Sequence, residues 1–90
     1  MNKYLTEVLQ EMFRRVGVNL NETLLENDAW YTTYSWTLAE QKDFENWFVN
    51  YLYNNTKARN ALCSIPRRSK KHLRKVAQEF IFQYGWSLKE

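Results

Sequence analysis

The chain has 90 residues, a length typical of one compact domain, so we expect residues 1–90 to form a single domain. It carries 13 basic and 10 acidic side chains, a net charge of +3, and its aromatic content of 17% can build a core without disulfide bonds. One cysteine excludes an internal disulfide, and no stretch approaches the roughly 20 apolar residues that span a bilayer. These two features predict a soluble cytoplasmic protein without a membrane partner.

The first apolar stripe, with steps of three and four residues, predicts a helix over Tyr4–Val16 that ends before Gly17. The segment that follows, residues 18–36, is rich in aromatic residues and threonine, which favours a strand, but the chain offers no second strand-like run for it to pair with. We therefore expect an ordered loop whose rings pack between helices. The alternative is that this segment contacts another chain, through Trp30, Tyr31 and Tyr34.

A capping box predicts the start of the second helix, because Thr37 and Glu40 can satisfy backbone donors of the first turn. Its apolar face carries Phe44, Trp47, Phe48, Tyr51 and Leu52. Val49 and Tyr53 fall at about 140° and 180° from Phe44, so we expect them on the opposite side. A helix that is apolar on two sides is central in its bundle or touches another subunit, which makes a homo-oligomer a second possibility.

A short helix is predicted over Thr56–Cys63, and it stops before Pro66. Ala58, Ala61 and Leu62 are expected to face inward. The last helix begins after Ser69, and its apolar stripe consists of Leu73, Val76, Ala77, Phe80, Ile81 and Tyr84. These elements predict an all-α fold, a small compact helical bundle of three main helices and one short helix, with an aromatic-rich ordered loop.

Charge is divided unevenly along the chain. Residues 1–45 hold four basic and eight acidic side chains, whereas residues 46–90 hold nine basic and two acidic ones. Six cations form a basic run that consists of Arg67, Arg68, Lys70, Lys71, Arg74 and Lys75. At 100° per residue, Lys71, Arg74, Lys75, Gln78 and Phe82 point away from the apolar stripe of the last helix.

A basic helix face that ends in an exposed ring suits phosphate contacts and stacking on an unpaired base, so nucleic acid is the first expected partner. An acidic protein surface would suit the same cations, and a solvated face without a partner is the third possibility. A helix-turn-helix made of the last two helices is a further alternative. Against it, the turn lacks glycine, and the last helix has few side chains that read base edges.

Little in the sequence favours catalysis. His72 is the only histidine and lies among cations that oppose its protonation. Cys63 lies on an alanine-rich helix, where a cysteine usually fills the core. The chain has no glycine-rich phosphate loop and no convincing set of metal ligands, so we expect a non-enzymatic protein without a metal or cofactor.

Four segments carry a resemblance to a known group of proteins: DAWYTTYSWT, FENWFVNYLYNN, PRRSKK and FQYGW. Together they resemble small proteins encoded by phages and prophages, and the similarity rests on aromatic positions from Asp28 onward. The resemblance implies a phage protein that acts in the bacterial cytoplasm or is packaged in a virion, but it assigns no functional residue. We expect a DNA-associated accessory factor or an inhibitor of a host nucleic-acid enzyme. The alternative is a structural or oligomeric module, such as a virion or assembly component.

Overall fold

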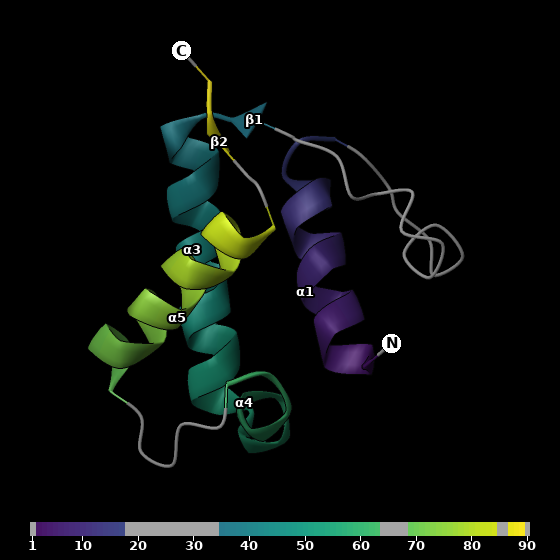
Figure 1. The fold of residues 1–90 in the computed structure, drawn as a ribbon, viewed down its shortest axis with the longest axis vertical. Coiled ribbons are helices and arrows are strands. Elements are labelled where there is room, and N and C mark those ends of the chain that lie inside the picture. The colour runs from purple at the N-terminus through teal and green to yellow at the C-terminus, as the bar shows by residue number, and fades with distance from the viewer. Residues whose placement is uncertain (1, 18–34, 64–68, 85–86, 90) are drawn as a thin grey trace.

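The structure is a computed structural model that describes residues 2–17, 35–63, 69–84 and 87–89. In chain order its elements are α1 (Lys3–Arg14), β1 (Ser35–Trp36), α3 (Leu38–Asn54), α4 (Thr56–Leu62), α5 (Lys70–Gln83) and β2 (Ser87–Leu88). Helices make up most of the described residues (Figure 1). The predicted all-α bundle of three main helices and one short helix is therefore confirmed.

Two helices, α3 and α5, begin at the capping residues that the sequence predicts. The Thr37 amide donates to Glu40 Oε1 at 2.8 Å and the Glu40 amide donates to Thr37 Oγ1 at 3.1 Å, which completes the capping box of α3. Hydrogen bonds that the Glu40 carboxyl accepts from Thr37, first from its backbone amide and then from its side chain, lower the pKa of that carboxyl. Ser69 caps α5 by accepting from the His72 amide at 3.2 Å. At the end of α1, Gly17 adopts the predicted left-handed conformation, with φ of 78°.

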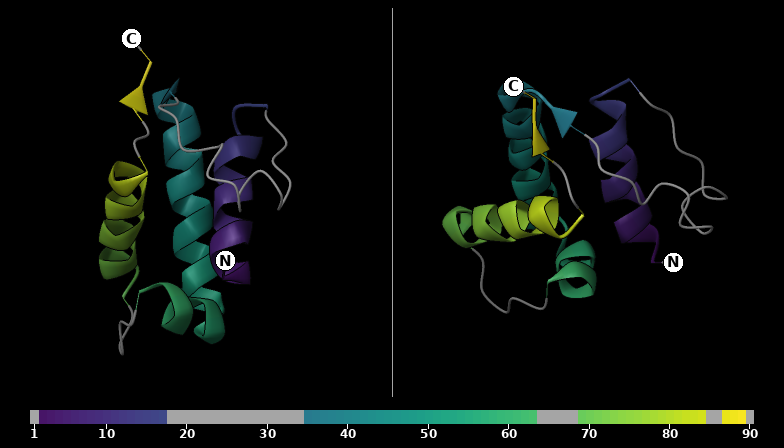
Figure 2. Two further views of the ribbon diagram at one scale, coloured as in Figure 1. Left: turned by 45° about the vertical axis from the view of Figure 1, so that its right-hand side comes forward. Right: turned by 45° about the horizontal axis from the view of Figure 1, so that its top comes forward.

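The central element is α3, as its two-sided apolar pattern predicts. It packs against α1, α4 and α5, and in the left view of Figure 2 it lies between α1 and α5. The core is made of Val8, Leu9, Met12, Phe13, Trp36, Phe44, Phe48, Val49, Leu52, Ala58, Leu73, Ala77 and Ile81. Every described helix contributes to this cluster, so the core that the apolar stripes predict is a continuous one.

The expected outward position of Val49 is wrong. Its side chain is only 2% exposed and belongs to the core. Glu45, one turn earlier on the same flank of α3, contacts Arg74 of α5, which shows that this flank faces α5. Val49 is therefore covered within the chain and does not contribute to a subunit interface. Tyr53 is 44% exposed.

The aromatic segment ends in a strand that does have a partner. β1 pairs in parallel with β2, with Trp36 opposite Leu88, and the Lys89 amide donates to the Trp36 carbonyl at 2.8 Å. This pair lies at the end of the bundle where α3 begins (Figure 1). The expectation that no strand could pair with this segment is wrong, because a two-residue strand such as β2 has no detectable alternation. Trp30, Tyr31 and Tyr34 lie outside the described residues.

Trp36 packs between the helices, in the role expected of the aromatic segment. Its side chain is fully buried, and its ring centroid lies 5.6 Å from that of Phe44. The indole Nε1 donates to Gln41 Oε1 at 3.2 Å, so the polar end of the ring is satisfied as well. The ring closes the end of the core under the strand pair.

In α4, Ala58 is buried as predicted, but Ala61 is exposed and Arg59 takes an inward position instead, at 3% exposure. Arg59 Nη1 donates to the Leu52 carbonyl at 2.7 Å and Nη2 donates to Thr56 Oγ1 at 3.2 Å. The guanidinium therefore satisfies a carbonyl at the C-terminal end of α3, where the helix dipole also favours a cation.

Candidate nucleic-acid interface

The outer face of α5 carries the residues that the apolar stripe leaves out. Leu73, Ala77 and Ile81 are buried. On the opposite side Lys71, Lys75, Gln78 and Phe82 are all exposed, which follows from their spacing of three and four residues. We call Lys70, Lys71, Arg74 and Lys75 the basic ridge. Arg67 and Arg68, the other members of the basic run, lie outside the described residues.

Lys71 and Lys75 are the two central cations of the basic ridge. They stand one turn apart, about 6 Å along the axis of α5. Within the part of the chain that the structure describes, neither takes part in an ion pair. Their ammonium groups are therefore available to an anionic partner.

Arg74 differs from these lysines because α3 holds it. Its Nη2 donates to Asn46 Oδ1 at 2.9 Å, and its Nη1 lies 3.7 Å from Glu45 Oε2. The Glu45 side chain is only 8% exposed, whereas that of Arg74 is 43% exposed. Arg74 therefore compensates a buried carboxylate and joins the two helices, while part of its guanidinium remains open to solvent. The sequence pattern alone treats it as one more outward cation.

The structure also brings Tyr53 to the basic ridge. Tyr53 lies in the last turn of α3, and the Lys70 Nζ lies 5.1 Å from the centroid of its ring. This is a cation–π distance, between two groups that are 17 positions apart in the sequence. The sequence assigns Tyr53 to a possible subunit interface, but its described neighbour is the first lysine of the basic ridge.

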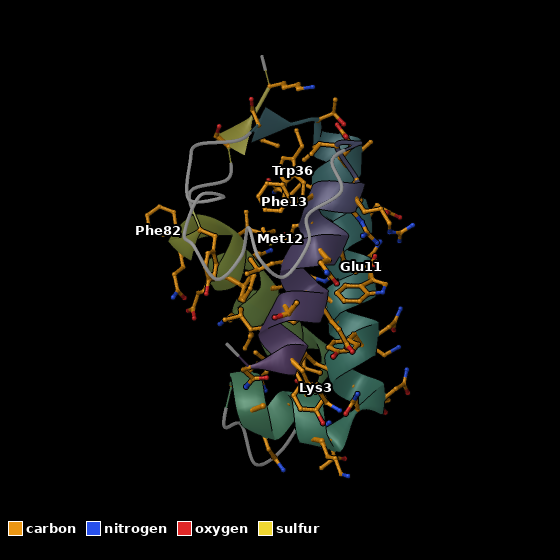
Figure 3. The ribbon with its side chains drawn as sticks, turned by 90° about the vertical axis from the view of Figure 1, so that its right-hand side faces the viewer. Lys3, Glu11, Met12, Phe13, Trp36 and Phe82 are labelled. Carbon is orange, nitrogen blue, oxygen red and sulfur yellow. The ribbon has the colours of Figure 1, made fainter. Side chains whose placement is uncertain are left out.

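Phe82 lies at the other end of the exposed line. It is 86% exposed, far more than any other large apolar side chain among the described residues. Figure 3 shows it projecting from α5 away from the interior, where Met12 and Phe13 lie. An apolar ring in this position contributes nothing to the core.

Exposed side chains of α3 extend the surface beside Arg74. Lys42 precedes Asn46 by one turn, and Asn50 follows it by one turn, so all three lie on the exposed face that carries the Arg74 contact. These residues were not among the site residues predicted from the sequence. Their polar spacing is a usable signal, but only the docking of α3 on α5 shows that they adjoin the basic ridge.

Among the described residues of the N-terminal half, four charged side chains pair with one another: Glu11, Arg14, Arg15 and Asp43. Glu11 accepts from Arg14 at 2.6 Å and from Arg15 at 2.7 Å, and Arg15 Nε lies 2.7 Å from Asp43 Oδ2. Burial acts to raise the pKa of Glu11, but the hydrogen bonds and charges of the two arginines outweigh it and lower that pKa below 4.5. The Arg15 guanidinium also lies 5.6 Å from the centroid of the Trp47 ring. Arg15 therefore serves the packing of α1 on α3.

His72 lies in α5, whereas Cys63 follows α4. His72 is exposed and its Nδ1 lies 3.0 Å from Ser69 Oγ, whereas the Cys63 thiol is partly buried and donates to the Arg59 carbonyl at 3.3 Å. A pocket of about 280 Å³ is lined by Leu62, Cys63, Val76, Glu79, Phe80 and Gln83. Among the described residues, no three His, Cys, Asp or Glu side chains come together as a metal site.

The helix-turn-helix alternative depends on residues 64–68, which lie outside the described part of the chain. The most extensive packing partner of α5 is α3.

Comparison with protein-family models, with curated proteins and with solved structures yields no match. Among the described helices, none is both long and apolar enough to cross a membrane.

Proposed function

We propose that this protein is a small non-enzymatic binding protein that contacts the phosphates of nucleic acid through the basic ridge. The observation that carries the proposal is the exposed line on α5, in which Lys71 and Lys75 lead to the uncovered ring of Phe82. Other cations of the described chain, such as Arg15 and Arg59, are used inside the fold. Phosphate contacts of this kind position a nucleic acid without reading its sequence.

The resemblance to phage proteins gives this proposal a setting. We place the protein in the cytoplasm of an infected bacterium, as a DNA-associated accessory factor or as an inhibitor that occupies the nucleic-acid site of a host enzyme. The accessory role needs a surface that attracts phosphate, which the cations of the basic ridge supply. An acidic protein surface would use the same cations, so direct binding to nucleic acid is the distinguishing measurement.

Salt dependence provides the test. If three or four cations of the basic ridge each contact a phosphate of a single strand, affinity falls about 20- to 50-fold between 50 and 200 mM salt. We would measure fluorescence anisotropy of labelled single- and double-stranded DNA and RNA at these two concentrations. The double variant Lys71→Gln/Lys75→Gln should weaken binding. It should also make the slope of log affinity against log salt concentration shallower by about 1.4.

A matched control loses the same charge elsewhere. Lys3 lies on α1 and Lys89 follows β2, so Lys3→Gln/Lys89→Gln also removes two positive charges and leaves the basic ridge intact. This variant should bind almost as well as the wild type. Equal weakening by the two double variants, or wild-type binding that ignores salt, would contradict the proposal.

The second candidate is a structural or oligomeric module, such as a virion or assembly component. The exposed rings of Phe82 and Tyr53 favour it, because aromatic side chains also anchor protein interfaces. An apolar interface would respond little to salt, and light scattering at high concentration would reveal the oligomer. A strict monomer under these conditions removes this candidate.

A further inference from the structure

The basic ridge has an exposed aromatic ring at each end. Tyr53 lies beside Lys70, where α5 begins, and Phe82 lies in the last turn of α5. The rise of an α-helix places Lys70 and Phe82 about 18 Å apart along the axis. The two rings come from different helices, and they meet the same line of cations only because α3 and α5 dock against each other.

From this arrangement we propose that the ligand is a single strand, and that Tyr53 and Phe82 each stack on an unpaired base. The inference rests on the proposed function, since it adds base stacking to the phosphate contacts of the basic ridge. In a duplex the faces of the bases are covered by their neighbours, so the lysines could still meet phosphates but the rings would find no base to stack on. Alternating cations and rings are typical of surfaces that bind single strands.

Phe82 is well placed for this role. Phe82 is 86% exposed, so its ring is open to solvent and can receive a base. Gln78 precedes it by one turn on the same exposed line and places an amide next to the ring. Lys75 lies about 10 Å before it along the axis, within the reach of a phosphate attached to the stacked nucleotide. The ring, the amide and the cation therefore address three different parts of one nucleotide.

Both Lys70 and a stacked base would contact the ring of Tyr53. The Lys70 ammonium lies 5.1 Å from the ring centroid, and the ring is 44% exposed. An exposed cation–π contact is weak, because water competes for the ammonium. A base can therefore stack on the ring while the Lys70 ammonium moves to the neighbouring phosphate. The contact holds the unoccupied ring near the basic ridge.

The axial separation between Lys70, which lies beside Tyr53, and Phe82 sets the length of the ligand. A strand that keeps the spacing of a duplex advances about 3.4 Å per nucleotide, so 18 Å corresponds to about five nucleotides, and to fewer in a stretched strand. We therefore expect affinity to rise with oligonucleotide length until both rings are engaged, and then to level off. No base-specific contact is needed, because every base offers a face for stacking.

The experiment removes each ring and each base separately. Phe82→Leu and Tyr53→Leu keep an apolar side chain without a ring, whereas Phe82→Trp and Tyr53→Phe keep a ring. The probes are a labelled 12-nucleotide thymidylate strand, an abasic strand of equal length and a duplex of equal length. The wild type should bind the thymidylate strand most tightly. Each leucine variant should lose about 5- to 100-fold for thymidylate.

The leucine variants should bind the abasic strand like the wild type, and the ring-preserving variants should behave like the wild type with all probes. Circular dichroism would verify that the exposed substitutions leave the helices intact. Unchanged thymidylate binding by either leucine variant, or equal wild-type affinity for all three probes, would overturn the two-ring proposal while leaving phosphate binding by the basic ridge in place. Absence of salt-dependent binding to any probe would overturn the proposed function itself, and the inference with it.

Discussion

Replacing Arg59 with leucine tests the view that a buried cation secures the end of α3. Leucine removes the donor that lies 2.7 Å from the Leu52 carbonyl and fills the site with a side chain that cannot donate. Arg59 is 3% exposed, so water does not readily replace its guanidinium. A buried carbonyl left without a donor costs about 1–3 kcal/mol. The bond to the exposed Thr56 hydroxyl adds little, because water can replace it.

We therefore expect Arg59→Leu to lower the free energy of unfolding by about 2 kcal/mol, part of the loss being offset by the apolar side chain. For a domain of this size such a loss lowers Tm by about 8–16 °C. Urea titration followed by circular dichroism at 222 nm measures the change. Arg59→Lys is the matched variant: one ammonium can reach the Leu52 carbonyl, so its loss should be smaller.

A leucine variant as stable as the wild type, or more stable, would refute this reasoning. That result would mean that the cost of burying the guanidinium equals or exceeds the value of its hydrogen bonds, as happens for some buried ionic groups.

The other predictions concern charge and packing. Glu11→Gln should destabilise the fold most near pH 7. The lowered pKa of Glu11 adds stability above pH 4.5, and this stability is lost as the pH falls through the folded-state pKa. Urea titrations at pH 7 and pH 3 would show that the difference in unfolding free energy between wild type and variant is smaller at pH 3. Arg74→Gln should cost about 1 kcal/mol of stability, since it leaves a buried carboxylate unpaired. In anisotropy titrations, Arg74→Gln should reduce the salt dependence of nucleic-acid binding less than Lys71→Gln or Lys75→Gln does. Val49→Ala should cost about 1–3 kcal/mol in urea titrations, whereas an outward Val49 would tolerate alanine.

Features fixed by neighbours in the sequence were predictable. The capping box at Thr37 and the cap at Ser69 depend on residues three positions away, and both form as expected. The left-handed Gly17 also follows from local conformation. The exposed line of Lys71 to Phe82 was accessible for the same reason, because it follows from the period of a single helix.

Features that depend on docking were not predictable. The sequence gives the angle at which Val49 projects from α3. It does not show which flank of α3 is covered by α5. The burial of Arg59 requires the end of α3 to lie against α4, and alanine patterns do not reveal this. Likewise, Tyr53 reaches Lys70 only through the packing of α3 on α5. The sequence therefore predicted only the part of the candidate site that lies on α5. It did not predict the part that lies on α3.

The pairing of β1 with β2 has a consequence for the order of folding. Most helical contacts join residues that are close in the chain, whereas Ser35 pairs with Ser87 across more than half of it. Closing so long a loop for two-residue strands gains little until α3 and α5 have docked, so the pair should form late and open early. The Lys89 amide, which donates to Trp36, should exchange its hydrogen faster than the central amides of α3. Brief opening at this end would then give the buried indole a route to solvent while the helices remain folded.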